Sequence, residues 1–161
     1  MYILDTNVLS EMRRARPHGG VLSWIRQHPD YAMFVSAVSI GEIQTGIEMT
    51  RKQDPAKAKQ LEAWCSDLIA SAQVISMGPD EFREYARLMR GKSETLIYDA
   101  MIAATANTHG FEVVTRNVAD FKALGIIPIN PFNHRWNSGG VSIVELVSMD
   151  RDSTFENIRK T

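Results

Sequence analysis

The sequence predicts an α/β domain in which a central, mostly parallel sheet carries helices on both faces. Short apolar runs recur along the chain, and segments with apolar residues at helical spacing follow them. Strands that alternate with helices in this way are typical of parallel sheets covered on both sides. With 161 residues and 44% hydrophobic residues, the chain is long enough for one domain with a full core.

Five apolar runs are the predicted strands of this sheet, at residues 2–4, 33–38, 74–75, 112–115 and 126–129. The helices predicted around them span residues 8–14, 21–26, 39–49, 55–72, 79–90, 96–108 and 118–124. Pro55 and Pro79 open two of these helices, at a position where a missing N–H costs no hydrogen bond. Gly110 follows the sixth helix near its C-cap.

The predicted domain covers residues 1–136, and residues 137–161 differ from it in composition. Asn137-Ser138-Gly139-Gly140 is typical of a linker. Residues 141–147 are a candidate for one extra strand, and residues 150–161 are polar, as chain ends often are. The sequence assigns no role to this tail.

Charge and cysteine content narrow the class of protein. The net charge of −1 and the pI of about 6.4 give no overall basic character, so a nucleic-acid partner would need a local patch. Cys65 is the only cysteine, which excludes an intramolecular disulfide and a cysteine-based zinc site and fits a cytoplasmic protein. No apolar run approaches the ~20 residues needed to span a membrane.

The first strand ends abruptly in three hydrogen-bonding side chains, Asp5-Thr6-Asn7. In an open parallel sheet, ligands bind just beyond the carboxyl ends of the strands. Asp, Thr and Asn are also common helix-capping residues. Asp5 is therefore either a helix cap or the floor of a binding site.

Asp99 is the only charged residue in the helical run from Leu96 to Ala106. Ile102, Ala103 and Ala106 share its face at helical spacing, and a helix that is apolar nearly all round is a buried one. Placement in the first turn gives a carboxylate only ~0.3–1 kcal/mol from the helix dipole, too little to offset burial. Because buried charges normally have a partner or a metal, Asp99 is a candidate functional residue.

Three further polar residues are ambiguous. Glu42 is the fourth residue of Ser39-x-x-Glu42, which is a capping-box pattern, but it also follows the second strand. Asn117 follows the fourth strand and is either an N-cap with Asp120 as its third residue or a polar ligand at the same edge. Asp120 is the weaker candidate, since helical spacing is expected to carry it away from Asn117.

Taken together, Asp5, Glu42, Asp99 and Asn117 each stand at the beginning of a helix, and a doubly wound sheet gathers such positions into one crevice. Two carboxylates ~4 Å apart repel by ~4 kcal/mol at an effective dielectric constant of 20. A divalent cation removes that repulsion, and all-oxygen ligands select hard ions such as Mg²⁺ or Mn²⁺. The four histidines, His18, His28, His109 and His134, fall in predicted turns or the terminal region, which argues against a nucleophilic triad.

Over residues 1–136, the order and spacing of these motifs resemble the PIN-domain ribonucleases, and within them the VapC toxins of bacterial toxin–antitoxin pairs. The motifs are Leu4-Asp5-Thr6-Asn7-Val8, Ser36 with Glu42, Tyr98-Asp99-Ala100 running into Ile102–Ala106, Thr115-Arg116-Asn117 with Asp120-Phe121, and Asn130-Pro131-Phe132. The resemblance implies a PIN-like three-layer sandwich, homodimers, Mg²⁺-dependent cleavage of phosphodiester bonds in RNA, and inhibition by a small antitoxin.

The resemblance also implies roles for single residues. Asp5, Glu42 and Asp99 form the acidic, metal-binding triad, and Asn117 stands where many relatives carry a fourth Asp. Thr6, Thr115 and Asp120 support the site. Arg13, Arg14 and Arg116 are the candidates to hold the phosphate backbone. The cluster of Arg13 and Arg14 with Arg16 is equally typical of a solvated helix face. An antitoxin tail would occupy the same crevice, with Val8, Leu9 and Met12 as apolar contacts if they are not wholly core.

Two other classes of protein stay open. A receiver-like or phosphatase-like domain, phosphorylated on an Asp, also uses acidic residues at strand ends. However, Asp5-Thr6-Asn7 lacks the second Asp of an Asp-x-Asp pair, and no well-placed Lys follows a late strand. A non-catalytic binding module is the alternative if the carboxylates only cap helices.

Overall fold

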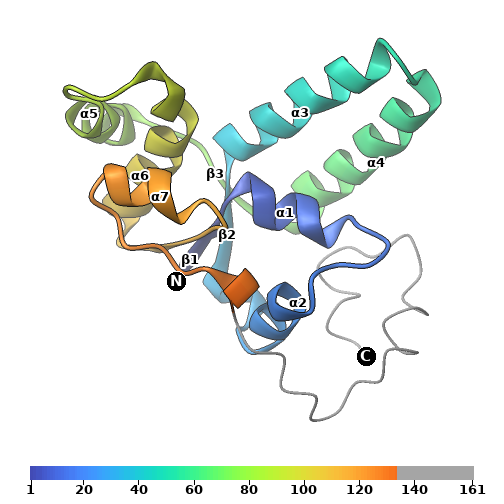
Figure 1. Ribbon diagram of the computed structural model, residues 1–161, viewed down its shortest axis with the longest axis horizontal. Helices are drawn as coiled ribbons and strands as arrows, with labels where there is room; N and C mark the ends of the chain where they lie inside the picture. The colour runs from blue at the N-terminus through green and yellow to red at the C-terminus, as the bar shows by residue number, and fades with distance from the viewer. Residues whose placement is uncertain (134–161) are drawn as a thin grey trace.

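The computed structural model describes residues 1–133, so the predicted linker, the extra strand at 141–147 and the polar tail lie outside the described range (Figure 1). Within it, parallel strands form one sheet in the order β3-β2-β1-β4. The strands are β1 (Tyr2–Leu4), β2 (Met33–Ser36), β3 (Gln73–Ile75) and β4 (Glu112–Val114). Leu4 lies opposite Val35 on one side and Val114 on the other, so the first strand of the chain is central.

Successive residues of β1 point to opposite faces of the sheet, and each face has its own core. Leu4 belongs to the core formed with α1 (Thr6–Met12), α2 (Gly19–Arg26), α3 (Ala37–Arg51) and α4 (Pro55–Ser71). Ile3 belongs to the core formed with α5 (Pro79–Leu88), α6 (Ile97–His109) and α7 (Val118–Ala123). Three 3₁₀ helices, Asp30–Ala32, Glu94–Leu96 and Pro131–Asn133, complete the described elements. The predicted three-layer α/β architecture is confirmed.

The predicted fifth strand at 126–129 is wrong in length. Only one bridge forms there, between Ile129 and Val114, through the hydrogen bonds of the Ile129 backbone to Val113 and Thr115 at 2.8 and 2.9 Å. Pro128 has no N–H to donate, and Ile127 is 86% exposed. The segment therefore touches the sheet at a single residue.

The second strand is shorter than predicted, and this changes the cap of the following helix. β2 ends at Ser36, whose hydroxyl accepts a hydrogen bond from the N–H of Val38 at 3.2 Å. Ser36 is thus the N-cap of α3, and the predicted capping box from Ser39 to Glu42 is wrong. Ser39 lies buried inside the first turn, which leaves Glu42 free of a capping role.

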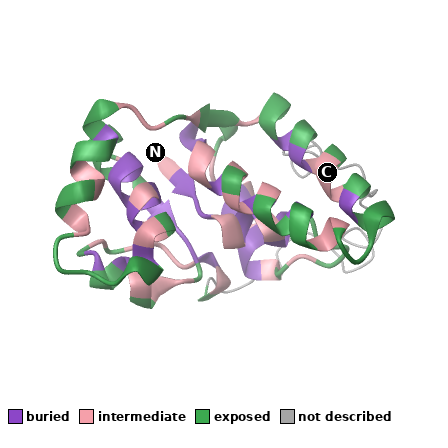
Figure 2. Ribbon diagram, turned by 90° about the horizontal axis from the view of Figure 1, so that it is seen from above, coloured by how far each residue is buried: buried purple, intermediate pink, exposed green. Residues whose placement is uncertain are grey.

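Helices α3 and α4 form a hairpin that projects from the sheet, joined across its outer end by the Arg51–Glu62 ion pair at 2.6 Å. Figure 2 shows that the buried residues lie mainly in the strands and the helices around them, whereas this hairpin is largely exposed. Among residues 1–133, no helix combines the length and the apolar character that crossing a membrane requires.

Candidate metal centre

The predicted site residues converge at the carboxyl edge of the sheet. Asp5 directly follows β1, Thr115 directly follows β4, and Glu42 lies in α3, which begins where β2 ends. Asp99 lies in the first turn of α6. The charges of Asp5, Asp120 and Glu42 all act on Asp99, so carboxylates from four separate chain segments share one region.

Asp5 is both a helix cap and the buried floor of this region, with only 4% of its surface exposed. One carboxylate oxygen accepts the Thr6 N–H at 2.7 Å. The other accepts the Thr115 hydroxyl at 2.6 Å and the side-chain amide of Asn7. Burial raises the pKa of Asp5, and these three hydrogen bonds act in the opposite direction by stabilising its charged form.

The hydroxyl of Thr115 uses its full hydrogen-bonding capacity at this point. It donates to Asp5 and accepts from the Asn7 side-chain amide at 2.9 Å and from the Asn117 N–H at 2.8 Å. Asn7 also accepts the Arg116 N–H at 2.9 Å, which ties the first turn of α1 to the segment after β4. Asn7 was assigned no role from the sequence, where its place two residues after Asp5 was the only signal.

Thr6 links Asp5 to Glu42. Its N–H donates to Asp5, and its hydroxyl donates to the Oε2 of Glu42 at 2.5 Å. Burial and the charge of Asp5 raise the pKa of Glu42, against the effect of the Thr6 hydrogen bond. Thr6 therefore binds both carboxylates, Asp5 through its backbone and Glu42 through its side chain.

Asn117 links the other two carboxylates, Asp99 and Asp120. It occupies the N-cap position of α7 but makes no side-chain cap bond. Instead its amide donates to Asp120 at 2.6 Å and to Asp99 at 3.4 Å. Asp120 is therefore not carried away from Asn117, contrary to the prediction from helical spacing. Burial, followed by the charges of Asp5, Asp120 and Glu42, raises the pKa of Asp99 to about 7.

The donor set fits a hard divalent cation bound by a few carboxylates. Within residues 1–133, no three acidic, histidine or cysteine side chains are close enough to form a ready-made cage. Mg²⁺ does not need one, since it is usually held by one or two carboxylates and keeps several waters. Asp5 and Asp99 supply all-oxygen ligands. Burial raises the pKa of both, and the charges of Asp5, Asp120 and Glu42 raise that of Asp99 further, so a bound cation would stabilise the charged forms.

The three arginines differ in their surroundings. The guanidinium of Arg13 lies 5.8 Å from the ring centre of Trp64, and that of Arg116 lies 4.9 Å from the ring centre of Phe132. Arg14 forms an ion pair with the buried Glu11 at 3.2 Å. Arg13 lines a pocket together with Glu42, and Arg116 follows Thr115 in the chain. Neither has an acidic partner within the described range, whereas Arg14 is already engaged.

A groove of about 250 Å³ leads away from the carboxylates between α1, α3 and α4. Thr6, Arg13 and Glu42 line it near the site, and the apolar side chains farther along belong to Ile43, Ile47, Leu61 and Trp64. The expectation that Val8, Leu9 and Met12 offer an apolar surface is wrong, because all three are buried in the core.

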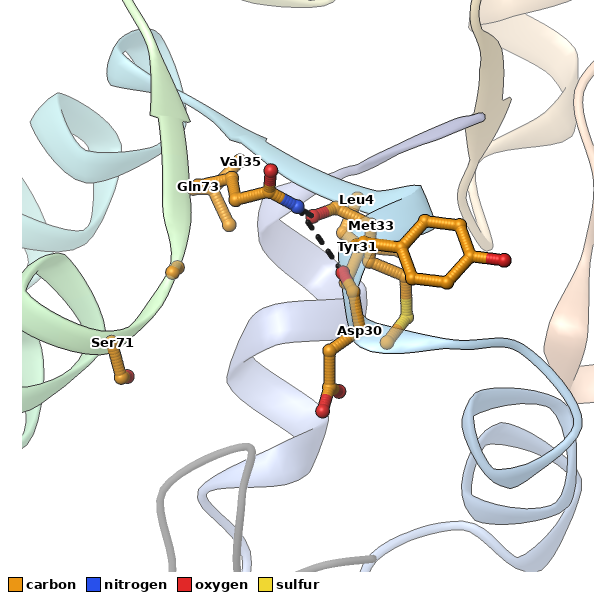
Figure 3. Close-up of a pocket in the computed structure, with 8 residues that line it drawn as sticks. Leu4, Asp30, Tyr31, Met33, Val35, Ser71 and Gln73 are labelled. Carbon is orange, nitrogen blue, oxygen red and sulfur yellow. Dashed lines mark hydrogen bonds between the residues drawn. The ribbon is translucent and has the colours of Figure 1, made fainter.

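A second pocket, of about 210 Å³, lies at the opposite edge of the sheet (Figure 3). Met33 and Gln73, the first residues of β2 and β3, line it together with Tyr31. The Gln73 amide donates to the backbone carbonyls of Asp30 and Met33, both at 3.2 Å. This pocket shares none of the carboxylates at the carboxyl edge.

Comparisons with known proteins agree with this fold. The family model described as "PIN domain" matches residues 2–126. The VapC ribonuclease Y4jK of Sinorhizobium fredii is 35% identical over 138 residues, which cover 82% of this chain and 98% of that protein. Toxin FitB of Neisseria gonorrhoeae is 29% identical, covering 83% and 99%. The crystal structure of FitAcB from the same organism superposes with a TM-score of 0.68 at 26% identity, covering 83% and 99%.

Proposed function

This chain belongs to the PIN-domain family, and we propose that it is the toxin of a type II toxin–antitoxin pair, an endoribonuclease that hydrolyses phosphodiester bonds in RNA. Relatives named VapC ribonuclease and FitB toxin, similar over nearly their whole length, support this activity. We place the reaction in the cytoplasm and assign Mg²⁺ as the cofactor, with Mn²⁺ as an alternative.

The observation that carries the proposal is the convergence of Asp5, Glu42, Asp99 and Asp120 at the carboxyl edge of the sheet, where burial and the neighbouring charges raise the pKa of Asp99 to about 7. A carboxylate with that pKa stands among the charges of Asp5, Asp120 and Glu42, and binding sites for Mg²⁺ are built from such groups. Mg²⁺ bound there would lower the pKa of a water molecule and neutralise charge on the phosphate. Asp5 and Asp99 would hold the ion.

Side chains of the protein would position the metal ligand Asp5, the attacking water and the RNA phosphates. The Thr115, Thr6 and Asn7 donors keep Asp5 in one orientation and favour its charged form. Glu42 is anchored by Thr6 through Oε2, and its other oxygen accepts no hydrogen bond within residues 1–133. That free oxygen would accept a hydrogen bond from the attacking water and orient it, and burial, by raising the pKa of Glu42, makes the carboxylate a stronger base. Arg13 and Arg116 would bind the phosphates on either side.

The partner implied by the family is an antitoxin, and the groove between α1, α3 and α4 is the surface we assign to it. The groove begins at Thr6 and Glu42 and ends among apolar side chains that include Trp64. A segment lying there would block access to Glu42. An antitoxin peptide and RNA, titrated together against the Asp99→Asn protein, should each weaken the binding of the other by the same factor. Independent binding of both would place the antitoxin elsewhere.

Cleavage of a labelled single-stranded RNA by the purified chain tests the function. Asp5→Asn and Asp99→Asn should abolish Mg²⁺-dependent cleavage, whereas the matched control Asp67→Asn, at an exposed position of α4, should keep it. Mg²⁺ at one hundred times its dissociation constant should stabilise the wild type by ~2.7 kcal/mol and the Asp99→Asn protein by much less.

The same experiment separates the alternatives. Cleavage by both substituted proteins at the wild-type rate would refute the assignment of the site. A phosphorylated Asp, trapped as an acyl phosphate, would favour the receiver-like class. A melting temperature that no divalent cation changes would favour a non-catalytic module whose carboxylates only cap helices.

A further inference from the structure

Tyr98 is an exposed aromatic residue immediately before Asp99, and the proposed reaction gives it no role. It is 55% exposed, although most of α6 is buried, including Ala100 and residues 102–106. Its side chain takes part in no hydrogen bond or ring contact among residues 1–133. Tyr98 is therefore not held there by the packing of the core.

The side of α6 on which Tyr98 lies follows from the contact that α6 makes with α5. Asn107 donates to Glu84 of α5 at 3.0 Å, so this side of α6 faces α5. Nine residues separate Tyr98 from Asn107, about 2.5 helical turns, which places Tyr98 on the opposite side. Figure 1 shows α6 between α5 and α3, and both helices pack against it. Tyr98 thus lies on the side of α6 away from α5.

Neighbouring residues of a helix point about 100° apart. An RNA strand whose scissile phosphate lies at Asp99 would therefore place the neighbouring nucleobase beside Tyr98 and away from the metal. Proteins that bind single-stranded RNA commonly stack its unpaired bases on exposed aromatic rings. Stacking also adds affinity that does not depend on charge, which matters here because the chain has a net charge of −1 and a crevice rich in carboxylates.

We propose that Tyr98 stacks on a nucleobase next to the scissile phosphate and so positions single-stranded RNA in the site. This inference rests on the proposed ribonuclease function and extends it to the way the substrate is held. Tyr98 acts through the base and does not touch the reacting atoms, so it is a positioning residue.

Three variants of the full-length chain test the proposal. Tyr98→Leu removes the ring, Tyr98→Phe keeps it, and Tyr31→Leu removes another exposed tyrosine, 72% exposed, at the pocket on the opposite edge of the sheet. Removal of one base-stacking ring typically weakens binding about 5- to 150-fold. The KM of Tyr98→Leu for a fluorescein-labelled, mixed-sequence RNA oligonucleotide should rise within that range with little change in kcat. Tyr98→Phe and Tyr31→Leu should resemble the wild type.

A second measurement changes the RNA and leaves residue 98 intact. In an Asp5→Asn background, which should bind without cutting, an abasic site is moved through the oligonucleotide one position at a time. Affinity should fall at one position, and the same abasic RNA should cost the Asp5→Asn, Tyr98→Leu protein nothing further. A variant that folds poorly would leave the first half of this scan valid.

The outcomes separate this inference from the function on which it rests. Wild-type protein that neither binds nor cleaves RNA would overturn both. Normal wild-type cleavage with an unchanged KM in Tyr98→Leu would overturn the stacking role alone. Tyr98→Leu protein whose sedimentation changes while its RNA binding does not would assign the ring to an interface between copies of the chain, and would equally overturn it.

Discussion

Thr115→Val removes one oxygen atom from the centre of the candidate site with little change in side-chain shape. The hydroxyl that is lost donates to Asp5 at 2.6 Å and accepts from Asn7 and from the Asn117 N–H. The variant therefore leaves a buried carboxylate with one donor fewer and two donors without their acceptor. We expect it to destabilise the fold and to raise the pKa of Asp5 further.

The size of the effect follows from these contacts. A hydrogen bond to a charged group contributes about 1.5–3 kcal/mol. Asn7 and Asn117 are only partly buried, so water can replace much of what they lose. The sum predicts a loss of about 2–4 kcal/mol while Asp5 is charged, and a loss nearer 1 kcal/mol once it is protonated and makes a neutral hydrogen bond. Because burial raises the pKa of Asp5, the loss should shrink as the pH is lowered.

Thr105→Val is the matched control. Thr105 is equally buried, at 0% exposure, but its hydroxyl donates only to the Met101 carbonyl in its own helix, at 2.9 Å. That bond should be worth about 1 kcal/mol at either pH. Urea unfolding of both variants at pH 4 and pH 8, without metal, measures the difference. Equal losses for the two variants at pH 8, or a Thr115→Val loss that does not change with pH, would refute the role assigned to the Thr115 hydroxyl in stabilising charged Asp5.

Three further predictions concern the carboxylates and the oligomeric state. Metal-free protein should lose stability as the pH rises from about 4 to about 7. Over this range folded Asp99, with a pKa of about 7, keeps a proton that an unfolded aspartate with a pKa near 3.8 has released. Urea unfolding at several pH values should show that the free energy of unfolding of Asp99→Asn depends less on pH than that of the wild type. Asn117→Asp adds a negative charge beside Asp99 and Asp120, which should lower the free energy of unfolding by roughly 1–4 kcal/mol without metal. Melting curves should also show a larger stabilisation by Mn²⁺ than in the wild type. A metal-free variant as stable as the wild type would contradict this prediction. The chain should sediment as a dimer at micromolar concentration, and Phe82→Ser, at a 51% exposed position of α5, should shift it toward monomer; a wild-type monomer would refute the prediction.

The candidate site residues that stand out most clearly in the sequence are those whose chemistry conflicts with their surroundings. Asp5 ends an apolar strand, and Asp99 is the only charge in an apolar helix, so each stood out without any knowledge of tertiary structure. The alternation of strands and helices likewise led to the parallel sheet and its two covered faces. In each case the signal lies within one segment of the chain.

The features that the sequence did not predict depend on contacts between distant segments. Asn7 looks like a turn residue until β4 brings Thr115 and Arg116 against it. Glu11 is charged but buried, where it accepts the His18 N–H at 2.9 Å and pairs with Arg14. No periodicity in the sequence reports such partners.

The central place of β1 also sets the order in which the protein can be assembled during its synthesis. Strand β1 leaves the ribosome before the other elements of residues 1–133, but the Thr115 that holds Asp5 is 110 residues farther along. At ~5–20 residues per second, those residues take roughly 5–20 s to synthesise. Throughout that time the strand lacks its β4 neighbour and Asp5 lacks the Thr115 hydroxyl. A nascent chain therefore emerges with an incomplete site, which delays any nuclease activity until translation has passed β4.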